Sequence, residues 1–432
     1  MVKLERSLGL WEVTLMSIGI ILGAGIYVVI GEAAGITGNS VWLSFVIGAI
    51  VASFTGLSYA ELCSRYPKAG AEYVYVKKSF GKRWAWIVGW LIIAGNIIGA
   101  SAVAMGFSNY FSALFSTDVM LTAVAVLIIA GIILIAGVKE TASVTILFTI
   151  IEATGLVIII FIGLQRLGSV DYLQLENGMK GLVEAGVLVF FSYLGFQGVT
   201  QLAEETRNPQ KNIPRAIIIS IIATTIIYIL VGISAVSVIP GVELAGADAP
   251  LAEIANVVFG EKSFILLSGI ALFSTFNTSL MMLLSSSRLV YGISNESALP
   301  KIFSKVSKRT LAPVFAVIAV VIISLLFLLL GDLKSIANLT NFTVFTVFIA
   351  VNASLIYLRV KKPDVPGFKV PLSIKKVPIL PVCGILTSIF MIVNLEKEIL
   401  LLGLLLFIAG LIVYYLYYKF TGKDDKNATD KL

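Results

Sequence analysis

Apolar runs of about 20 residues recur along the whole chain, and each is long enough to cross a bilayer as a helix. A helix suits that setting because it satisfies its backbone hydrogen bonds internally. The chain is 58% hydrophobic and 13% charged, about half the charge of a soluble domain. The period-two alternation of a membrane β-barrel is absent. We therefore predict an all-α polytopic protein embedded in the lipid bilayer.

Twelve runs are predicted to span the membrane, and the basic residues between them test that number. The predicted spans are residues 11–36, 40–62, 84–112, 119–137, 141–165, 181–203, 215–238, 262–290, 312–331, 334–358, 378–395 and 398–418. With the N-terminus inside, 27 of the 32 Lys and Arg residues fall in cytoplasmic loops, which carry such an excess in membrane proteins. We predict a multi-pass protein of the plasma membrane with both termini cytoplasmic.

Two connecting segments carry patterns of their own. Residues 66–83 mix aromatic and basic side chains, which predicts an amphipathic helix on the cytoplasmic face. The outer loop at 239–261 is expected to form short surface helices. The polar residues after Lys419 are expected to be disordered.

Side-chain chemistry argues against other classes of protein. The chain has no histidine, which removes the commonest metal ligand and proton shuttle. Cys63 and Cys383 lie in or beside apolar runs and form no disulfide framework. Neither a nucleophile–base pair nor clustered catalytic carboxylates stand out, so we expect no enzyme, no catalytic site, no resident metal and no cofactor. The net charge of +7 lies in topology-setting loops, which argues against a nucleic-acid partner.

Glycine-containing interruptions lie halfway along the first and sixth spans. At the helical rise, Gly23-Ala24-Gly25 lies roughly 18 Å into the first span and Ser192-Tyr193 about 17 Å into the sixth. Paired interruptions at equal depth in two inverted halves are typical of a transporter binding site. An alternative is that Gly19 and Gly23 form a packing face for another helix.

The inverted halves define the predicted domain organisation. The segments are a cytoplasmic N-terminus at 1–10, a first repeat of five helices at 11–165, a second repeat of five helices at 181–358, two further helices at 378–418 and a cytoplasmic tail at 419–432.

The ends of the interrupted helices predict the ligand. A helix restarting after the first break presents N–H groups of Ala24, Gly25 and Ile26 with partial positive charge, which suits a carboxylate. The helix ending at the second break presents carbonyls around Phe191 and Ser192, which suit an ammonium group. Together they fit the zwitterion of an α-amino acid.

Several short motifs follow one another in order over roughly residues 10–315. They are Gly23-Ala24-Gly25-Ile26-Tyr27, Tyr59-Ala60-Glu61-Leu62, Pro67 to Tyr73, Gly195-Phe196-Gln197, Ala203 to Pro209, Ile213-Pro214, Ser287 to Tyr291 and Leu299-Pro300. These motifs resemble those of the amino acid–polyamine–organocation superfamily, whose members have the LeuT-type fold with a 5+5 inverted repeat.

The resemblance implies a secondary transporter of amino acids that works by alternating access, with helices 1 and 6 interrupted at mid-membrane. It implies substrate contacts at Ile21, Gly23, Ala24, Gly25, Phe191, Ser192 and Leu194, with Phe191 or Tyr193 as an aromatic gate. Two positions depart from the family pattern. Glu152 stands where many proton-coupled relatives carry a lysine, and Gln197 stands where an acidic residue is expected.

Glu152 lies roughly 17 Å into the fifth span, where a charge costs several kcal/mol. It is a candidate proton carrier, or a Na⁺ ligand together with helix 1 carbonyls and the hydroxyls of Ser274, Thr275 and Thr278. Asn277 is a further candidate for ion coupling. The alternative is a protonated Glu152 hydrogen-bonded to a neighbouring helix. At the cytoplasmic helix ends, Glu61, Glu204 and Glu205 are either solvated or paired with Arg65, Arg207, Arg215 or Arg288 in an inner gate.

The predicted function is import of free amino acids coupled to a proton or Na⁺. Within the first and sixth spans, no Asp or Glu lies near the breaks, so we expect neutral substrates. An amino acid–polyamine exchanger and a non-transporting amino acid sensor remain alternatives. The sequence specifies neither the particular amino acid nor the oligomeric state.

Overall fold

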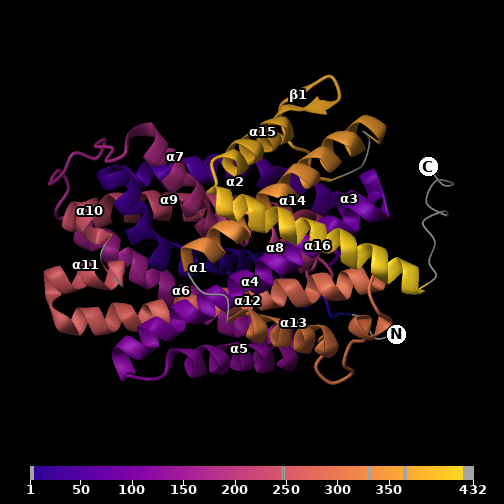
Figure 1. Ribbon diagram of the computed structural model, residues 1–432, viewed down its shortest axis with the longest axis horizontal. Coiled ribbons are helices and arrows are strands. Elements are labelled where there is room, and N and C mark those ends of the chain that lie inside the picture. Colours follow the sequence, from indigo (N-terminus) through magenta and orange to yellow (C-terminus); the bar gives the residue numbers. More distant parts are fainter. Residues whose placement is uncertain (1–3, 246, 248, 329–332, 363–366, 422–432) are drawn as a thin grey trace.

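The computed structural model describes residues 4–245, 247, 249–328, 333–362 and 367–421. Most of these residues form helices that run along the long axis of one bundle (Figure 1). The predicted C-terminal disorder lies outside the described residues, apart from the last residues of the final helix.

The first half of the chain contains six long or medium helices and one short one. They are α1 (Leu10–Thr37), η1 (Gly38–Ser40), α2 (Val41–Arg65), α3 (Ala71–Phe80), α4 (Lys82–Phe115), α5 (Val119–Ala136) and α6 (Val138–Leu164).

The second half begins with a span built from several pieces. Its elements are α7 (Gly178–Val189), η2 (Phe190–Tyr193), α8 (Gly198–Gln201), α9 (Pro209–Val238), α10 (Gly241–Leu244), α11 (Pro250–Phe259), α12 (Glu261–Asn295), η3 (Lys301–Ser304), α13 (Val314–Phe327), α14 (Leu333–Lys361), β1 (Ser373–Ile374), β2 (Val377–Pro378), α15 (Ile379–Val393) and α16 (Lys397–Thr421).

Nine helical segments among the described residues are long and apolar enough to cross a membrane. The first of them, Leu10–Arg65, contains both α1 and α2, and the apolar helices α13 and α15 are shorter. Every predicted span overlaps a helix. The polytopic all-α class is therefore confirmed.

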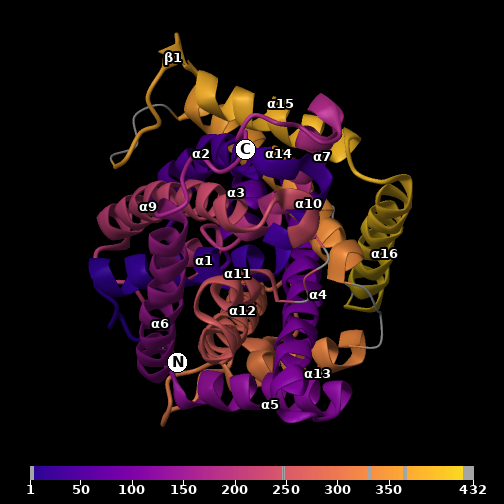
Figure 2. The same ribbon diagram turned by 90° about the vertical axis from the view of Figure 1, so that its left-hand side faces the viewer.

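The helices divide into an inner and an outer set. Helix α1 lies in the middle of the bundle and packs against α6, α7, α9 and α12, whereas α16 runs along the outside (Figure 2). Outer helices expose large apolar side chains such as Leu121, Ile132 and Leu404. In a membrane protein such a surface faces lipid, so the interrupted helix is shielded from the bilayer by its neighbours.

The connecting segments differ in part from expectation. The loop at 239–261 contains the short helices α10 and α11, as predicted. Helix α3 also forms, but Glu72, Tyr73 and Tyr75 are buried, so it is more deeply packed than a surface amphipathic helix. The β1–β2 hairpin was not predicted; it protrudes from the bundle (Figure 1).

Candidate functional site

Helix α1 is interrupted at Gly23, where the backbone leaves helical geometry with φ −32° and ψ −148°. The adjacent Ala24 N–H donates a hydrogen bond of 2.8 Å to Thr278 Oγ1 on α12. A β-carbon added at Gly23 would lie 1.7 Å from that same oxygen. Glycine is therefore required here because α12 approaches the broken backbone directly.

The second interruption separates α7 from α8. Leu194 is extended (ψ 141°), and Gly195 has φ +126°, in the left-handed region that favours glycine. The side chain of Gln197 turns back so that its Oε1 accepts a hydrogen bond of 3.0 Å from the Gly195 N–H. Gln197, which departs from the family pattern, thus stabilises the break itself.

The two interruptions touch each other. A β-carbon added at Gly25 would lie 2.3 Å from Ser192 Cα, so the two interrupted segments pack backbone against backbone. The hydroxyl of Tyr228, on α9, contacts the carbonyl oxygens of Ile21 and of Ser192, the latter at 2.9 Å. One side chain therefore joins both breaks.

Several backbone groups that we expected to be free are engaged in this conformation. The Ala24 amide is held by Thr278, the carbonyl of Ser192 by Tyr228, and the carbonyl of Phe191 by the Leu194 N–H. Ser192 also occupies the space beside Gly25. The reason is that unpartnered backbone groups are costly in a buried site, so nearby groups satisfy them.

Phe191, Ser192, Tyr193 and Leu194 are all buried. The Tyr193 hydroxyl donates to the Phe45 carbonyl at 2.9 Å, which anchors that ring to α2. The Ser192 Oγ has no hydrogen-bond partner among the described residues. Of the side chains at the second break, Ser192 is thus the one with an unused polar group.

Glu152 is fully buried on α6, one helix away from the breaks. Its Oε1 accepts a hydrogen bond of 3.3 Å from Asn277 Nδ2, and its backbone carbonyl accepts one of 2.6 Å from the Tyr27 hydroxyl. Tyr27 belongs to α1, four residues beyond the break. The Glu152 segment is therefore tied to α1 and to α12.

Thr149 and Ser274 face the same carboxyl group as Asn277 does. Among the described residues, three buried oxygens of this cluster have no hydrogen-bond partner. They are Oε2 of the Glu152 carboxyl group itself, Ser274 Oγ and Asn277 Oδ1. Hard cations prefer such oxygen ligands. The group fits either a proton on the carboxylate or a small cation.

Two of the predicted coupling residues serve other contacts. The Thr275 hydroxyl donates to the Ala271 carbonyl at 2.8 Å, one turn back on its own helix. The Thr278 hydroxyl donates to the Ser274 carbonyl and accepts from Ala24. The sequence missed Thr149, because a threonine in an apolar helix gives no signal of which neighbour it faces.

The helix ends that the sequence assigns to the cytoplasmic side contain buried ion pairs. Arg288 binds Glu205 in a bidentate manner, with Nε–Oε2 at 3.1 Å and Nη2–Oε1 at 3.0 Å, and both side chains are fully buried. Glu61 binds Arg65 and also Arg359 of α14. Pairing of Glu61 with Arg65 and of Glu205 with Arg288 is confirmed. Arg359 was missed because 298 residues separate it from Glu61.

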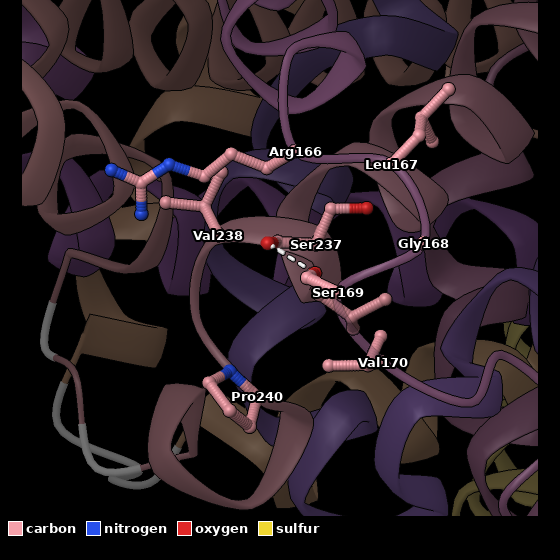
Figure 3. A pocket seen from close by; sticks show the side chains of 9 residues that line it. Arg166, Leu167, Gly168, Ser169, Val170, Ser237, Val238 and Pro240 are labelled. Carbon is pink, nitrogen blue, oxygen red and sulfur yellow. Dashed lines mark hydrogen bonds between the residues drawn. The ribbon is translucent and has the colours of Figure 1, made fainter.

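A groove of about 530 Å³ lies elsewhere, between the segment after α6 and the end of α9 (Figure 3). Ser169 Oγ donates to the Ser237 carbonyl at 2.7 Å across it, and Arg166 extends along its edge. None of the break residues lines it. The groove therefore does not belong to the site formed by the two interruptions.

The fold and the site define a polytopic membrane protein whose core consists of two mutually contacting interrupted helices. A family model described as amino acid permease matches residues 8–396. The chain belongs to that family.

Three relatives are similar in sequence to this protein over most of its length. The branched-chain amino acid permease BcaP of Bacillus subtilis is 32% identical, with 96% of this chain and 93% of that protein covered. A vacuolar cationic amino acid transporter 4 of Arabidopsis thaliana is 31% identical over 72% of this chain and 56% of its own length. A methylthioribose transporter of Bacillus subtilis is 27% identical, with 96% and 94% covered.

Proposed function

We propose that this protein is a secondary active transporter that imports neutral amino acids across the plasma membrane by ion-coupled alternating access. The observation that carries the proposal is the contact between the two breaks, where the backbone of Gly25 packs on Ser192 and Tyr228 contacts carbonyls of both helices. Polar backbone at membrane depth is tolerated only where it is buried in protein or lines a cavity. Two such segments meeting in the core form a natural site for a polar solute.

The proposed architecture has twelve membrane spans with both termini cytoplasmic. Residues 11–165 and 181–358 form the two inverted repeats of a LeuT-type fold, and 378–418 forms two added helices. The distribution of basic residues and the matching positions of the interruptions in the two halves support this arrangement.

The substrate α-carboxylate binds the amides of Ala24 and Gly25, and its ammonium group binds the carbonyls of Ile21 and Ser192. In this conformation the Ala24 amide is engaged by Thr278, and the two carbonyls by Tyr228. Binding therefore exchanges those side-chain contacts for substrate contacts, which lowers the net cost of separating the breaks. Phe191 then closes the site on one side.

A neutral substrate is supported by two observations. Residues 13–31 and 185–203 contain no Asp or Glu, so a cationic side chain would be buried there without an acidic partner, which is costly. In addition, BcaP of Bacillus subtilis, which covers nearly the whole chain, is described as a branched-chain amino acid permease.

Coupling is assigned to Glu152 and Asn277, together with Thr275 and Thr278 of the same helix α12, as a proton site or a Na⁺ site. The unpartnered oxygens of Glu152, Ser274 and Asn277 support that assignment. The Tyr27 bond to the Glu152 carbonyl gives the coupling site a direct connection to the broken helix.

Uptake into proteoliposomes tests the function. Radiolabelled leucine, alanine and arginine are presented with an inward proton gradient, an inward Na⁺ gradient or neither. We expect uptake of the neutral amino acids above that of arginine, driven by one of the two gradients. Uptake only into vesicles preloaded with amino acid would instead identify an exchanger. Saturable binding without flux would identify a sensor.

A further inference from the structure

A second buried carboxyl group lies at the cytoplasmic end of the molecule, away from Glu152. Glu72, on α3, is fully buried, and no ion pair among the described residues includes it. This contrasts with Glu61 and Glu205, which are buried at the same end and bound to arginines. A buried carboxyl group without a cation is stable only when it is protonated or well hydrogen-bonded.

A chain of polar side chains leads to Glu72 from the membrane core. Asn96 Nδ2 on α4 donates to Ser285 Oγ on α12 at 3.3 Å, and Ser285 donates to Gln201 Oε1 on α8. Gln201 Nε2 in turn donates to the Glu72 carboxyl oxygens at 3.4 and 3.3 Å. All four side chains are buried. Since α8 is the segment directly after the second break, Glu72 is connected to an element that must move when the inner path opens.

The remaining neighbours of Glu72 bear no charge of opposite sign. Tyr59 and Cys63 of α2 and Tyr75 of α3 face it. The arginines of the surrounding helices are bound elsewhere: Arg288 of α12 to Glu205, and Arg65 of α2 and Arg359 of α14 to Glu61. Lys77 of α3 binds Glu296, the residue directly after α12, and Lys82 and Arg83 at the start of α4 are exposed.

We propose that Glu72 is a proton-binding positioning residue of the inner gate, protonated while the gate is closed and ionised when the gate opens to cytoplasmic water. The proposal rests on transport by alternating access. Its chemistry is one proton taken up from cytoplasmic water on closing and returned to it on opening, with no other bond changed.

Burial raises the pKa of the Glu72 carboxyl group to about 7, because the hydrogen bonds from its own backbone and from the Gln201 side chain offset only part of the desolvation. In the open gate the pKa returns toward the ordinary value of about 4.3. The closed state therefore binds the proton more tightly and is favoured at low pH. Opening becomes easier as pH rises between these two pKa values and stops responding above the higher one.

Counterflow of leucine tests the proposal in proteoliposomes with equal pH on both sides, so that no gradient contributes. For the wild type we expect the rate to rise several-fold between about pH 5.5 and pH 7 and then to level off. Glu72→Gln should lose that component of the rise, since it cannot ionise, while Glu72→Asp should keep it. Glu140→Gln, the same change at an exposed carboxyl group near the cytoplasmic start of α6, is the matched control and should follow the wild type.

A second variant keeps the test decisive should Glu72→Gln fold poorly. Gln201→Met removes the amide that favours the charged carboxylate, so the plateau should be reached at a higher pH. A Glu72→Gln curve that matches the wild type, or an unshifted Gln201→Met curve, would overturn the role of Glu72. An absence of counterflow in the wild type would instead contradict the proposed transport function.

Discussion

Glu152 on α6 and Glu205 in the turn after α8 are both fully buried carboxyl groups, but their surroundings are opposite. Glu205 is neutralised by two hydrogen bonds from Arg288, whereas Glu152 receives one long bond from Asn277 and keeps one oxygen unpartnered. A paired charge holds together the two segments that carry it, here α12 and the turn after α8, since separating the charges is costly. An under-satisfied carboxyl group remains able to accept a proton or a cation. The Arg288–Glu205 pair therefore suits a structural latch, whereas Glu152 suits the coupling site that we propose.

The largest expected effect comes from breaking the latch. Arg288→Met should destabilise the protein by about 3–5 kcal/mol, because it leaves the Glu205 charge buried without a partner. The thermal unfolding midpoint in detergent measures the loss. The double variant Arg288→Met/Glu205→Met should recover most of it, since it removes both charges. Equal destabilisation of the single and double variants would show that the pair does not act as a latch.

The breaks themselves depend on close packing. Gly25→Leu should abolish uptake, because a side chain there collides with the backbone of Ser192 and fills the proposed carboxylate site. Overpacking of this kind also costs about 1–3 kcal/mol of stability. Uptake and unfolding midpoints are measured together with those of Gly269→Leu, at a glycine whose added β-carbon meets nothing within 4 Å. Normal uptake by the Gly25 variant would refute the site.

Thr278 connects the break to the helix that carries Asn277. Thr278→Val removes the acceptor of the Ala24 N–H at nearly constant volume and leaves a buried donor unpaired, which costs about 1–3 kcal/mol. Thr278→Ser keeps the hydroxyl and should lie close to the wild type in unfolding midpoint. If valine and serine have equal effects, the hydrogen bond does not stabilise the break.

The sequence predicted those features that depend on composition and local pattern. Span positions, the glycine breaks and the unusual Glu152 could be identified because apolar length and helix-breaking residues act locally. Partners across the fold could not be identified in the same way. Arg359 contacts Glu61, and Tyr228 contacts both breaks, only because distant helices pack together. The engaged Ala24 amide was missed for the same reason.

The smallest expected change in stability is at Glu152, and it tests how this carboxyl group differs from the paired Glu205. Glu152→Gln keeps the shape of the side chain and retains an oxygen for the Asn277 bond, so the unfolding midpoint should stay within the range of a neutral substitution, about 0.5 kcal/mol. The variant can neither release a proton nor provide a charge for Na⁺. Net uptake should therefore lose its dependence on an ion gradient, while leucine counterflow continues.

Uptake driven by proton and Na⁺ gradients is compared with counterflow in the same vesicles. Gradient dependence equal to that of the wild type would assign coupling to another group, and a large loss of stability would make Glu152 a structural residue like Glu205.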